Sequence, residues 1–134
     1  MTAPLKKVLV VDDNEIDLKK MGSIFEQEGV DVAYAHSGVE AAKWLKKNGN
    51  TRLDAIICDV MMPEMNGIEL SQLIGGNFPL ILVSDEGELP LLTDEYLDLV
   101  QAFVDKSDCE QTLFNATIKA QERWSQDLKI PMAA

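Results

Sequence analysis

The chain has 134 residues, of which 46% are hydrophobic, and this length fits one domain with a single core that needs no disulfides. Its formal charge of -11 argues against direct binding to nucleic acid or to an anionic membrane surface, since both need clustered Lys and Arg. Cys58 and Cys109 make no disulfide framework, and no N-terminal apolar stretch is long enough for a signal peptide or a membrane span, so we expect a cytoplasmic protein.

The first half of the chain alternates short apolar runs with amphipathic segments. The run Val8–Val11 is too continuous for a half-exposed strand and predicts a buried one. Gly29 and the sequence Asn48-Gly49-Asn50 end the two amphipathic segments, which are typical of helices. The predicted elements are, in order, a strand at Lys6–Val11, a helix capped by Asp13 or Asn14 and running to about Glu28, a strand at Val30–Ala35, and a helix at Val39–Lys47 capped by Ser37.

The second half continues the alternation. Gly75-Gly76 ends a short helix early, and an acidic stretch at 85–88 precedes a helix that begins either at Leu89 or at Thr93. Ser107 and Glu110 have the spacing of a capping box for the last helix. The predicted elements are, in order, a strand at Asp54–Asp59, a loop at Val60–Asn66, a helix from Gly67 to about Ile74, a strand at Leu80–Val83, a helix ending at Val100, a strand at Ala102–Asp105, and a helix to about Trp124.

Five apolar strands that alternate with helical segments predict right-handed βαβ crossovers. The expected fold class is therefore α/β, with a doubly wound parallel sheet that helices cover on both faces. We assign residues 1–124 to this domain and residues 125–134 to a short C-terminal tail. In such a sheet, ligands bind outside the carboxyl ends of the strands. The residues expected at those ends are Asp12, Asp13, Asp59, Ser84 and Lys106.

These residues suit one kind of chemistry. Carboxylates about 4 Å apart repel by about 4 kcal/mol per pair at an effective dielectric near 20, so the site needs a cation. Mg2+ suits it, with Mn2+ as an alternative, because this hard ion takes oxygen ligands and is often held by one or two carboxylates plus a phosphate. A divalent cation, the ammonium of Lys106 and the hydroxyl of Ser84 together predict a place that receives a phosphoryl group.

Each of these residues also has an ordinary interpretation. Asp12 and Asp13 alone are typical of a helix cap, Lys106 of a solvated lysine, and Ser84 of a strand end. Their shared register with Asp59 favours a site. Elsewhere, we expect His36 to be a surface histidine, Cys58 to be buried packing, and the acidic stretch 85–98 to be either solvated surface or a docking face for a basic partner.

The chain resembles a receiver domain of a two-component response regulator over nearly all of residues 5–124. Each segment that carries the resemblance is a weak signal alone, but their order and spacing are very specific. The segments are VLVVDD at 8–13, CDVMMP at 58–63 with Gly67, PLILVS at 79–84, and FVDK at 103–106. The resemblance implies a flavodoxin-like fold with five parallel strands in the order 2-1-3-4-5.

The resemblance also implies which residues handle the phosphoryl group and the metal. Asp59 would accept a phosphoryl group from a histidine kinase or a histidine phosphotransfer protein. Asp13, Asp59 and the backbone carbonyl of Met61 would bind Mg2+ directly, whereas Asp12 would act through a bound water. Lys106 would pair with Asp59 and then with a phosphoryl oxygen.

A switch is implied as well. Ser84 would hydrogen-bond another phosphoryl oxygen, and Phe103 would be the aromatic residue that turns inward in response, unless it is simply a core aromatic. The face that changes would be formed by the helix expected to end at Val100, the strand at Ala102–Asp105 and the last helix, which runs to about Trp124.

Three residues depart from the family pattern. Ser107 follows the lysine where the family usually has a proline with a cis peptide, and we expect a trans bond here because a non-proline cis bond costs about 2.5 to 4 kcal/mol. Asp85 adds a negative charge beside the site, which predicts weaker or altered phosphorylation unless it points to solvent. Phe103 lacks the hydroxyl of the more common tyrosine.

The sequence therefore favours a stand-alone phosphoacceptor module that is not a turnover enzyme and that acts by binding an unknown downstream protein. The main alternative is a pseudo-receiver, an interaction module that phosphate does not switch. A Mg2+-dependent phosphatase with Asp59 as nucleophile has less support, since the chain offers no cap domain. An excised receiver of a larger kinase is a further alternative.

Overall fold

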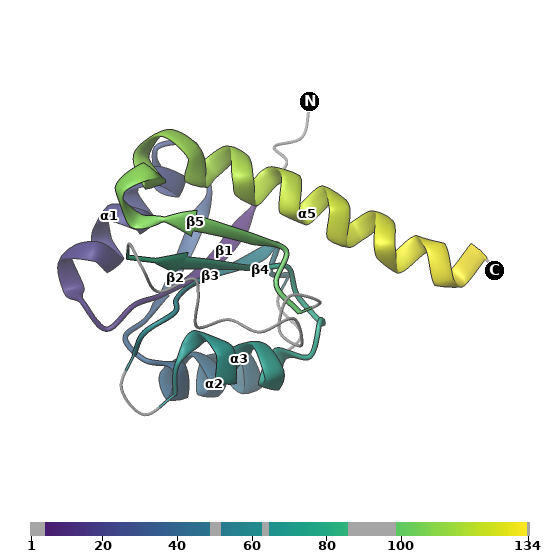
Figure 1. Ribbon diagram of the computed structural model, residues 1–134, viewed down its shortest axis with the longest axis horizontal. Coiled ribbons are helices and arrows are strands. Elements are labelled where there is room, and N and C mark those ends of the chain that lie inside the picture. Colours follow the sequence, from purple (N-terminus) through teal and green to yellow (C-terminus); the bar gives the residue numbers. More distant parts are fainter. Residues whose placement is uncertain (1–4, 49–51, 63–64, 86–98, 134) are drawn as a thin grey trace.

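A parallel β-sheet forms the middle layer of the fold (Figure 1). The computed structural model describes residues 5–48, 52–62, 65–85 and 99–133. Within them the strands are β1 (Lys7–Val11), β2 (Asp31–Ala35), β3 (Ala55–Asp59), β4 (Leu80–Ser84) and β5 (Ala102–Asp105). All neighbouring strands are parallel, in the order β2-β1-β3-β4-β5. The predicted α/β fold and its strand order 2-1-3-4-5 are confirmed.

The central strands are buried on both faces. Every residue of Val8–Val11, Ala55–Cys58 and Leu80–Val83 is 0% exposed. The edge strand β2 differs, with Asp31 exposed and Val32 only half-buried. Continuous apolar runs predict these central strands because a parallel sheet covered by helices leaves no solvent-facing side.

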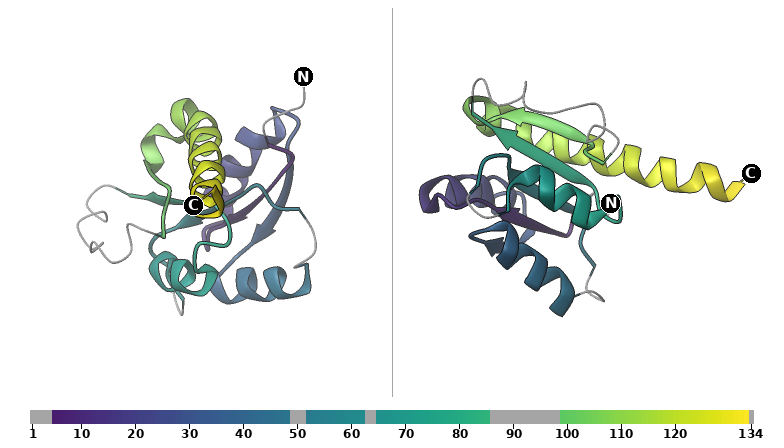
Figure 2. Two further views of the ribbon diagram at one scale, coloured as in Figure 1. Left: turned by 90° about the vertical axis from the view of Figure 1, so that its right-hand side faces the viewer. Right: turned by 60° about the horizontal axis from the view of Figure 1, so that its bottom comes forward.

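Helices cover both faces of the sheet (Figures 1 and 2). The helices α1 (Glu15–Glu26) and α5 (Cys109–Ala133) pack on one face, and α2 (Gly38–Lys47) and α3 (Gly67–Ile74) pack on the other. Successive strand residues point to opposite faces. Ile57 of β3 therefore joins the core cluster beneath α1 and α5, while its neighbours Ile56 and Cys58 join the cluster beneath α2 and α3.

Local sequence signals set the helix ends. Asn14 Oδ1 accepts a hydrogen bond from the backbone N–H three positions later at 3.0 Å, so Asn14 rather than Asp13 caps α1. Ser37 caps α2 in the same way. After α1 and α3 the chain turns at Gly29 and Gly75, which adopt φ of 79° and 59°. This left-handed region favours glycine, so both predicted stops are confirmed.

The last helix is longer than predicted. It continues from Cys109 to Ala133, whereas the sequence favoured an end near Trp124. Trp124 Nε1 donates to the backbone oxygen of Gly76 at 2.8 Å, and Arg123 Nη2 donates to the backbone oxygen of Gln101 at 2.7 Å. These two bonds join the helix, at its predicted end, to the segments that precede β4 and β5. No Gly or Pro follows until Pro131, so nothing in the sequence stops the helix there.

The predicted capping box at Ser107 and Glu110 is wrong. A 3-10 turn, η2 (Lys106–Asp108), precedes α5, and Asp105 caps this turn. Asp105 Oδ1 accepts hydrogen bonds from Ser107 N at 3.0 Å and from Ser107 Oγ at 2.9 Å. The Ser107 hydroxyl therefore donates backward to a carboxylate instead of accepting from the following turn.

Some predictions fall on residues outside the described part of the chain. They are Asn50 with Gly49 after α2, Pro63 after β3, and most of the stretch from the acidic loop to the helix expected before Val100. Among the described helices, none has both the length and the apolar character to cross a membrane.

Candidate functional site

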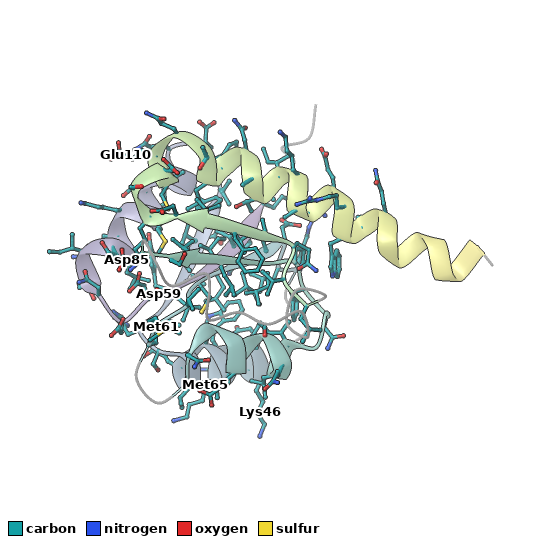
Figure 3. All side chains as sticks on the ribbon, viewed as in Figure 1. Lys46, Asp59, Met61, Met65, Asp85 and Glu110 are labelled. Carbon is teal, nitrogen blue, oxygen red and sulfur yellow. The ribbon has the colours of Figure 1, made fainter. Side chains whose placement is uncertain are left out.

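Four strands deliver polar residues to one edge of the sheet. Asp12 directly follows β1, Asp59 and Ser84 are the last residues of β3 and β4, and Lys106 directly follows β5. The parallel register aligns these ends, since Asp59 pairs with Val83, the residue before Ser84. Figure 3 shows Asp59 and Asp85, which follows β4, at this same end of the sheet.

The structure brings the three predicted carboxylates together. One oxygen from each of Asp12, Asp13 and Asp59 lies within 4.8 Å of the others. Asp12 and Asp59 are buried, with 0% and 4% of the residue exposed, whereas Asp13 is exposed. The cluster is thus open on one side, where Asp13 meets solvent.

Lys106 is surrounded by carboxylates. Its Nζ lies 3.2 Å from Asp12 Oδ2 and 3.4 Å from Asp59 Oδ2, as the predicted site requires. Its shortest contact, at 3.0 Å, is with Asp17 Oδ2 in the first turn of α1. Asp17 was absent from the predicted site, and the one available signal was its place in the helix turn that follows Asp13.

Burial and neighbouring charges shift the pKa values of these groups. Burial, together with the charge of Asp12, raises the pKa of Asp59 to about 7, although Lys106 and the Met61 N–H oppose the shift. Burial also raises the pKa of Asp12. Burial disfavours the charged form of Lys106. The hydrogen bond that its ammonium donates to Asp17, together with the nearby carboxylates, outweighs this effect and raises the pKa of the lysine.

The two oxygens of Asp59 have different partners. Oδ1 accepts a hydrogen bond from Met61 N at 3.4 Å, and Oδ2 faces Lys106. The loop after β3 returns closely to this point, because Gly67 N donates to the Val60 oxygen at 2.9 Å. A Cβ on Gly67 would lie 2.8 Å from the Asp59 carbonyl oxygen, so glycine allows α3 to begin directly beside the site.

Ser84 and Phe103 occupy the positions expected of them. Ser84 is 1% exposed, and within the described part of the chain its Oγ has no hydrogen-bond partner. A buried hydroxyl without a partner is costly, so this atom is suited to a ligand that enters the site. Phe103 is half-buried and packs against the core cluster beneath α2 and α3. Its roles as core aromatic and as switch residue are both compatible with this place.

The acid cluster fits a hard divalent cation. All of its donors are oxygens, which such cations prefer. Asp12 Oδ2 is buried and, apart from its ion pair with Lys106, accepts no hydrogen bond from the described residues. A cation there would also relieve the repulsion that contributes to the raised pKa of Asp59. Asp12, Asp13 and Asp59 could therefore hold a metal ion.

Comparison with known proteins identifies the family of the chain. The model of the response regulator receiver domain family matches residues 8–117, which contain every residue of the site. The chain belongs to this family. It is thus a receiver domain of two-component signalling, and the resemblance carried by the sequence motifs is confirmed.

Relatives of the receiver domain include regulators and kinases. It is 34% identical over 102 residues to the alkaline phosphatase synthesis transcriptional regulatory protein PhoP of Bacillus subtilis. This match covers 69% of this chain and 41% of that protein. It is 38% identical over 69 residues to Histidine kinase 3 of Arabidopsis thaliana, covering 52% of this chain and 6% of that protein. The chain therefore spans less than half the length of either relative.

Solved structures support the same fold. A response regulator receiver domain protein from Clostridium thermocellum matches with a TM-score of 0.79 and 25% identity, over 91% of this chain and 98% of that chain. The N-terminal domain of a response regulator/sensory box/GGDEF 3-domain protein from Carboxydothermus hydrogenoformans has a TM-score of 0.78 at 24% identity, over 92% of this chain and 99% of that chain.

The departures of this receiver domain from the family pattern have structural counterparts. The described residues contain no cis peptide bond, so the bond before Ser107 is trans as predicted. The Ser107 N–H, which a proline would lack, donates to Asp105. Lys106 reaches Asp59 all the same. Asp85 is exposed beside the end of β4, so its carboxylate is not buried within the cluster.

Two further side chains match their expected roles outside the site. His36 is exposed and contacts Glu15 through Nε2 at 2.8 Å and Glu40 through Nδ1 at 3.3 Å, which makes it a satisfied surface histidine. Cys58 is fully buried, and burial raises the pKa of its thiol. Neither side chain takes part in the acid cluster.

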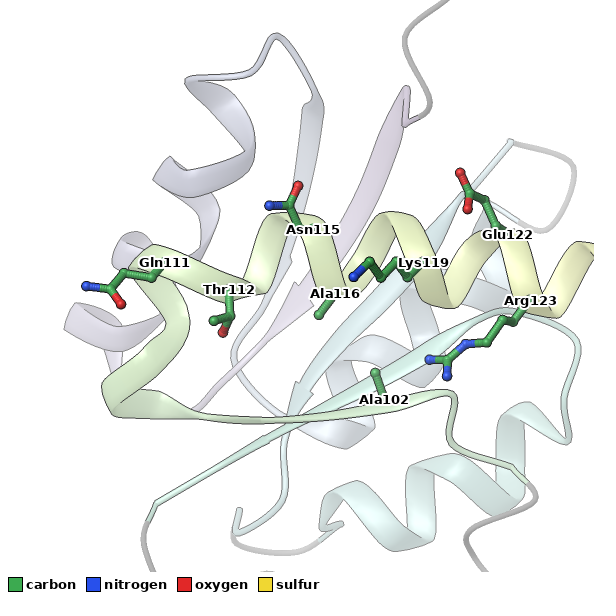
Figure 4. A pocket seen from close by; sticks show the side chains of 8 residues that line it. All are labelled: Ala102, Gln111, Thr112, Asn115, Ala116, Lys119, Glu122 and Arg123. Atoms are coloured by element: carbon green, nitrogen blue, oxygen red, sulfur yellow. The ribbon is translucent and has the colours of Figure 1, made fainter.

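Surface cavities adjoin α5, and one of them reaches the site. A cavity of about 310 Å³ lies between α1 and the start of α5 and includes Asp17 and Lys106 in its lining. Another, of about 560 Å³, lies between β5 and α5 and contains none of the site residues (Figure 4). Its lining is formed by Ala102, Gln111, Thr112, Asn115, Ala116, Lys119, Glu122 and Arg123.

Proposed function

We propose that this receiver domain is a phosphoacceptor, with Asp59 as the residue that receives the phosphoryl group. The observation that carries the proposal is the position of Asp59, which ends β3 among two further carboxylates and 3.4 Å from the Lys106 ammonium. A nucleophilic carboxylate beside a cation site and a lysine meets the main needs of phosphoryl transfer, namely positioning and charge neutralisation.

The donor in this proposal is a phosphohistidine of a histidine kinase or a histidine phosphotransfer protein. An ionised oxygen of Asp59 attacks the phosphorus, and the bond between the phosphorus and the donor's imidazole nitrogen breaks. The electron pair of that bond stays on the nitrogen, which takes up a proton from solvent. Asp59 must be ionised for this attack, so its raised pKa makes charge compensation within the site necessary.

Mg2+ is the proposed cofactor, held by Asp13, Asp59 and the backbone carbonyl of Met61, with Asp12 acting through a water. When bound, this ion supplies positive charge to the carboxylates and to the incoming phosphoryl oxygens. Lys106 would neutralise a phosphoryl oxygen, since its ammonium lies 3.4 Å from Asp59 Oδ2. The chain's own residues thus provide the nucleophile, the cation ligands and one fixed positive charge.

The output of the domain is a change of protein-binding surface and not catalytic turnover. In the proposed switch, Ser84 Oγ, which has no partner within the described ranges, donates to a phosphoryl oxygen, and Phe103 follows by turning inward. Ser84 ends β4 and Phe103 lies in the neighbouring edge strand β5, so the change would reach β5 and the elements around it, where a downstream protein would bind.

A phosphate-independent interaction module is the second candidate. Two observations favour it: Asp85 adds an exposed negative charge at the end of β4, and Lys106 already has three carboxylate contacts. In that case the acid cluster and Lys106 would contribute to the stability of the fold and would not accept a phosphoryl group.

Treatment with acetyl phosphate and Mg2+, followed by intact-mass analysis, separates the candidates. The phosphoacceptor proposal predicts one added phosphoryl group on the wild type, none on Asp59→Asn, and none when EDTA replaces Mg2+. An unmodified wild type would favour the interaction module. Turnover of a phosphate ester that depends on Asp59 would instead support the phosphatase alternative.

A further inference from the structure

Four residues at the site form a closed ring of contacts. Asp12 Oδ1 accepts a hydrogen bond from Asn14 N at 2.9 Å, and Asn14 Oδ1 accepts one from Asp17 N at 3.0 Å. Asp17 Oδ2 accepts one from Lys106 Nζ at 3.0 Å, and the same Nζ lies 3.2 Å from Asp12 Oδ2. The cap of α1 therefore fixes the helix turn that directs Asp17 toward the lysine.

Lys106 contacts carboxylates of two kinds. Asp12 and Asp59 belong to the acid cluster. Asp17 lies outside that cluster and makes the shortest contact. The lysine side chain is 16% exposed and that of Asp17 is 34% exposed, so solvent weakens the pair without removing it.

A phosphoryl group on Asp59 would need this same ammonium. Nζ can approach a new phosphoryl oxygen only by giving up part of its contact with Asp17, because its other neighbours are the carboxylates of the site itself. Asp17 also places a fourth negative charge near an incoming anion, in addition to those of Asp12, Asp13 and Asp59. Both effects weaken the binding of the phosphoryl anion, whereas the negative charge of Asp17 attracts a divalent cation.

We propose that Asp17 is a positioning residue that competes with the phosphoryl group for Lys106, and thereby weakens phosphoryl binding while strengthening cation binding. This inference rests on the proposed phosphoacceptor function. It gives Asp17 opposite effects on the two ligands. A residue that merely supported the fold would change both affinities in the same direction.

The test measures two affinities on the full chain. Mg2+ affinity is obtained by calorimetric titration without phosphate, and beryllofluoride affinity by titration at saturating Mg2+. For Asp17→Asn we expect beryllofluoride to bind about two- to fivefold more tightly and Mg2+ about twofold more weakly, because partly exposed ion pairs change equilibrium constants by factors of this order.

Two matched variants serve as controls. Glu110→Gln removes one negative charge from the lining of the cavity that also contains Asp17 and Lys106, at the start of α5 (Figure 3). We expect both affinities of this variant to stay near those of the wild type. Asp17→Glu keeps the carboxylate. We expect both affinities of this variant to lie closer to those of the wild type than the affinities of Asp17→Asn do.

The outcomes distinguish the inference from the function on which it rests. A wild type that binds no beryllofluoride would overturn the proposed function, and this inference with it. A wild type that binds beryllofluoride, together with an Asp17→Asn variant whose two affinities are unchanged or both lower, would overturn the inference alone. A similar gain in beryllofluoride affinity in Glu110→Gln would also overturn it, because net charge and not the lysine contact would then be the cause.

Discussion

Lys106 Nζ lies 3.4 Å from Asp59 Oδ2, although the two residues are 47 positions apart and β4 separates their strands. The lysine therefore reaches across the end of the intervening strand, where the Ser84 hydroxyl has no hydrogen-bond partner among the residues that the structure describes. The ammonium of Lys106, the carboxylate of Asp59 and the hydroxyl of Ser84 thus lie at the same edge of the sheet. The following experiments test the separate parts of this arrangement.

Asp13→Asn should abolish cation binding without weakening the metal-free fold. Asp13 is the exposed member of the acid cluster, so its carboxylate contributes to ligand binding more than to packing. Mg2+ at about 100 times its dissociation constant should stabilise the wild type by about 2.7 kcal/mol. Thermal unfolding with and without Mg2+ should show this stabilisation in the wild type and little of it in the variant. An undiminished Mg2+ effect in Asp13→Asn would contradict the assignment.

The metal-free protein should lose stability as the pH rises through neutrality because of Asp59. Its pKa in the folded state is about 7, above the usual value of 3.8. Asp59 therefore favours the folded state fully only below pH 3.8, and this contribution is lost as the pH rises through 7. At pH 8, Asp59→Asn should be more stable than the wild type by on the order of 2 to 4 kcal/mol.

Urea unfolding at pH 5 and pH 8 provides the measurement. The difference between Asp59→Asn and the wild type should be larger at pH 8, and it should shrink when Mg2+ is added. A difference that does not depend on pH would show that burial does not raise the pKa of Asp59 as described.

The strands and the acid cluster could be predicted from the sequence because their signals are local. Val8–Val11 is continuous and apolar because both faces of β1 are covered, and Asp12 follows where that run stops. Parallel topology then brings the strand ends together without any knowledge of side-chain positions. The prediction of Asp12, Asp13, Asp59 and Lys106 as one group needed no more than this.

Other features depend on contacts between distant parts of the chain. Asp17 meets Lys106 across 89 positions, and the contact depends on how α1 is tilted over the sheet. Trp124 contacts Gly76, which is 48 positions away in the sequence. The residues of the last helix alone therefore could not predict where α5 is attached. At Ser107 two local patterns competed, and the carboxylate of Asp105 was the better partner.

Ser84→Ala should separate stability from ligand binding. The Ser84 hydroxyl is buried without a partner in the described structure, and leaving such a group unsatisfied costs about 1 to 3 kcal/mol. The variant should therefore unfold at the same or a slightly higher urea concentration than the wild type. Its beryllofluoride affinity should fall about tenfold or more, since a hydrogen bond to a charged group contributes about 1.5 kcal/mol or more.

Ser84→Thr is the matched control, because it keeps a hydroxyl at this position. It should retain most of the beryllofluoride affinity. If Ser84→Ala instead lost stability and bound beryllofluoride like the wild type, the hydroxyl would be structural.

Trp124→Phe tests how α5 is attached to the turn that follows α3. The change removes the hydrogen bond from Nε1 to the Gly76 oxygen but keeps an aromatic ring. The free energy of unfolding should fall by about 1 kcal/mol, as for a typical intramolecular hydrogen bond. Gln126→Ala, at an exposed position of the same helix, should stay within about 0.5 kcal/mol of the wild type. Equal stabilities for the wild type and both variants would argue against this attachment.

The most direct test of the central claim is a crystal structure of the wild type with Mg2+ and beryllofluoride. We expect beryllium to be bound to an oxygen of Asp59, with Lys106 Nζ and Ser84 Oγ each within hydrogen-bond distance of a fluorine and Mg2+ held by Asp13 and Asp59. An unmodified Asp59 under saturating beryllofluoride, with Lys106 still paired to the same three carboxylates, would contradict the assignment of this receiver domain as a phosphoacceptor.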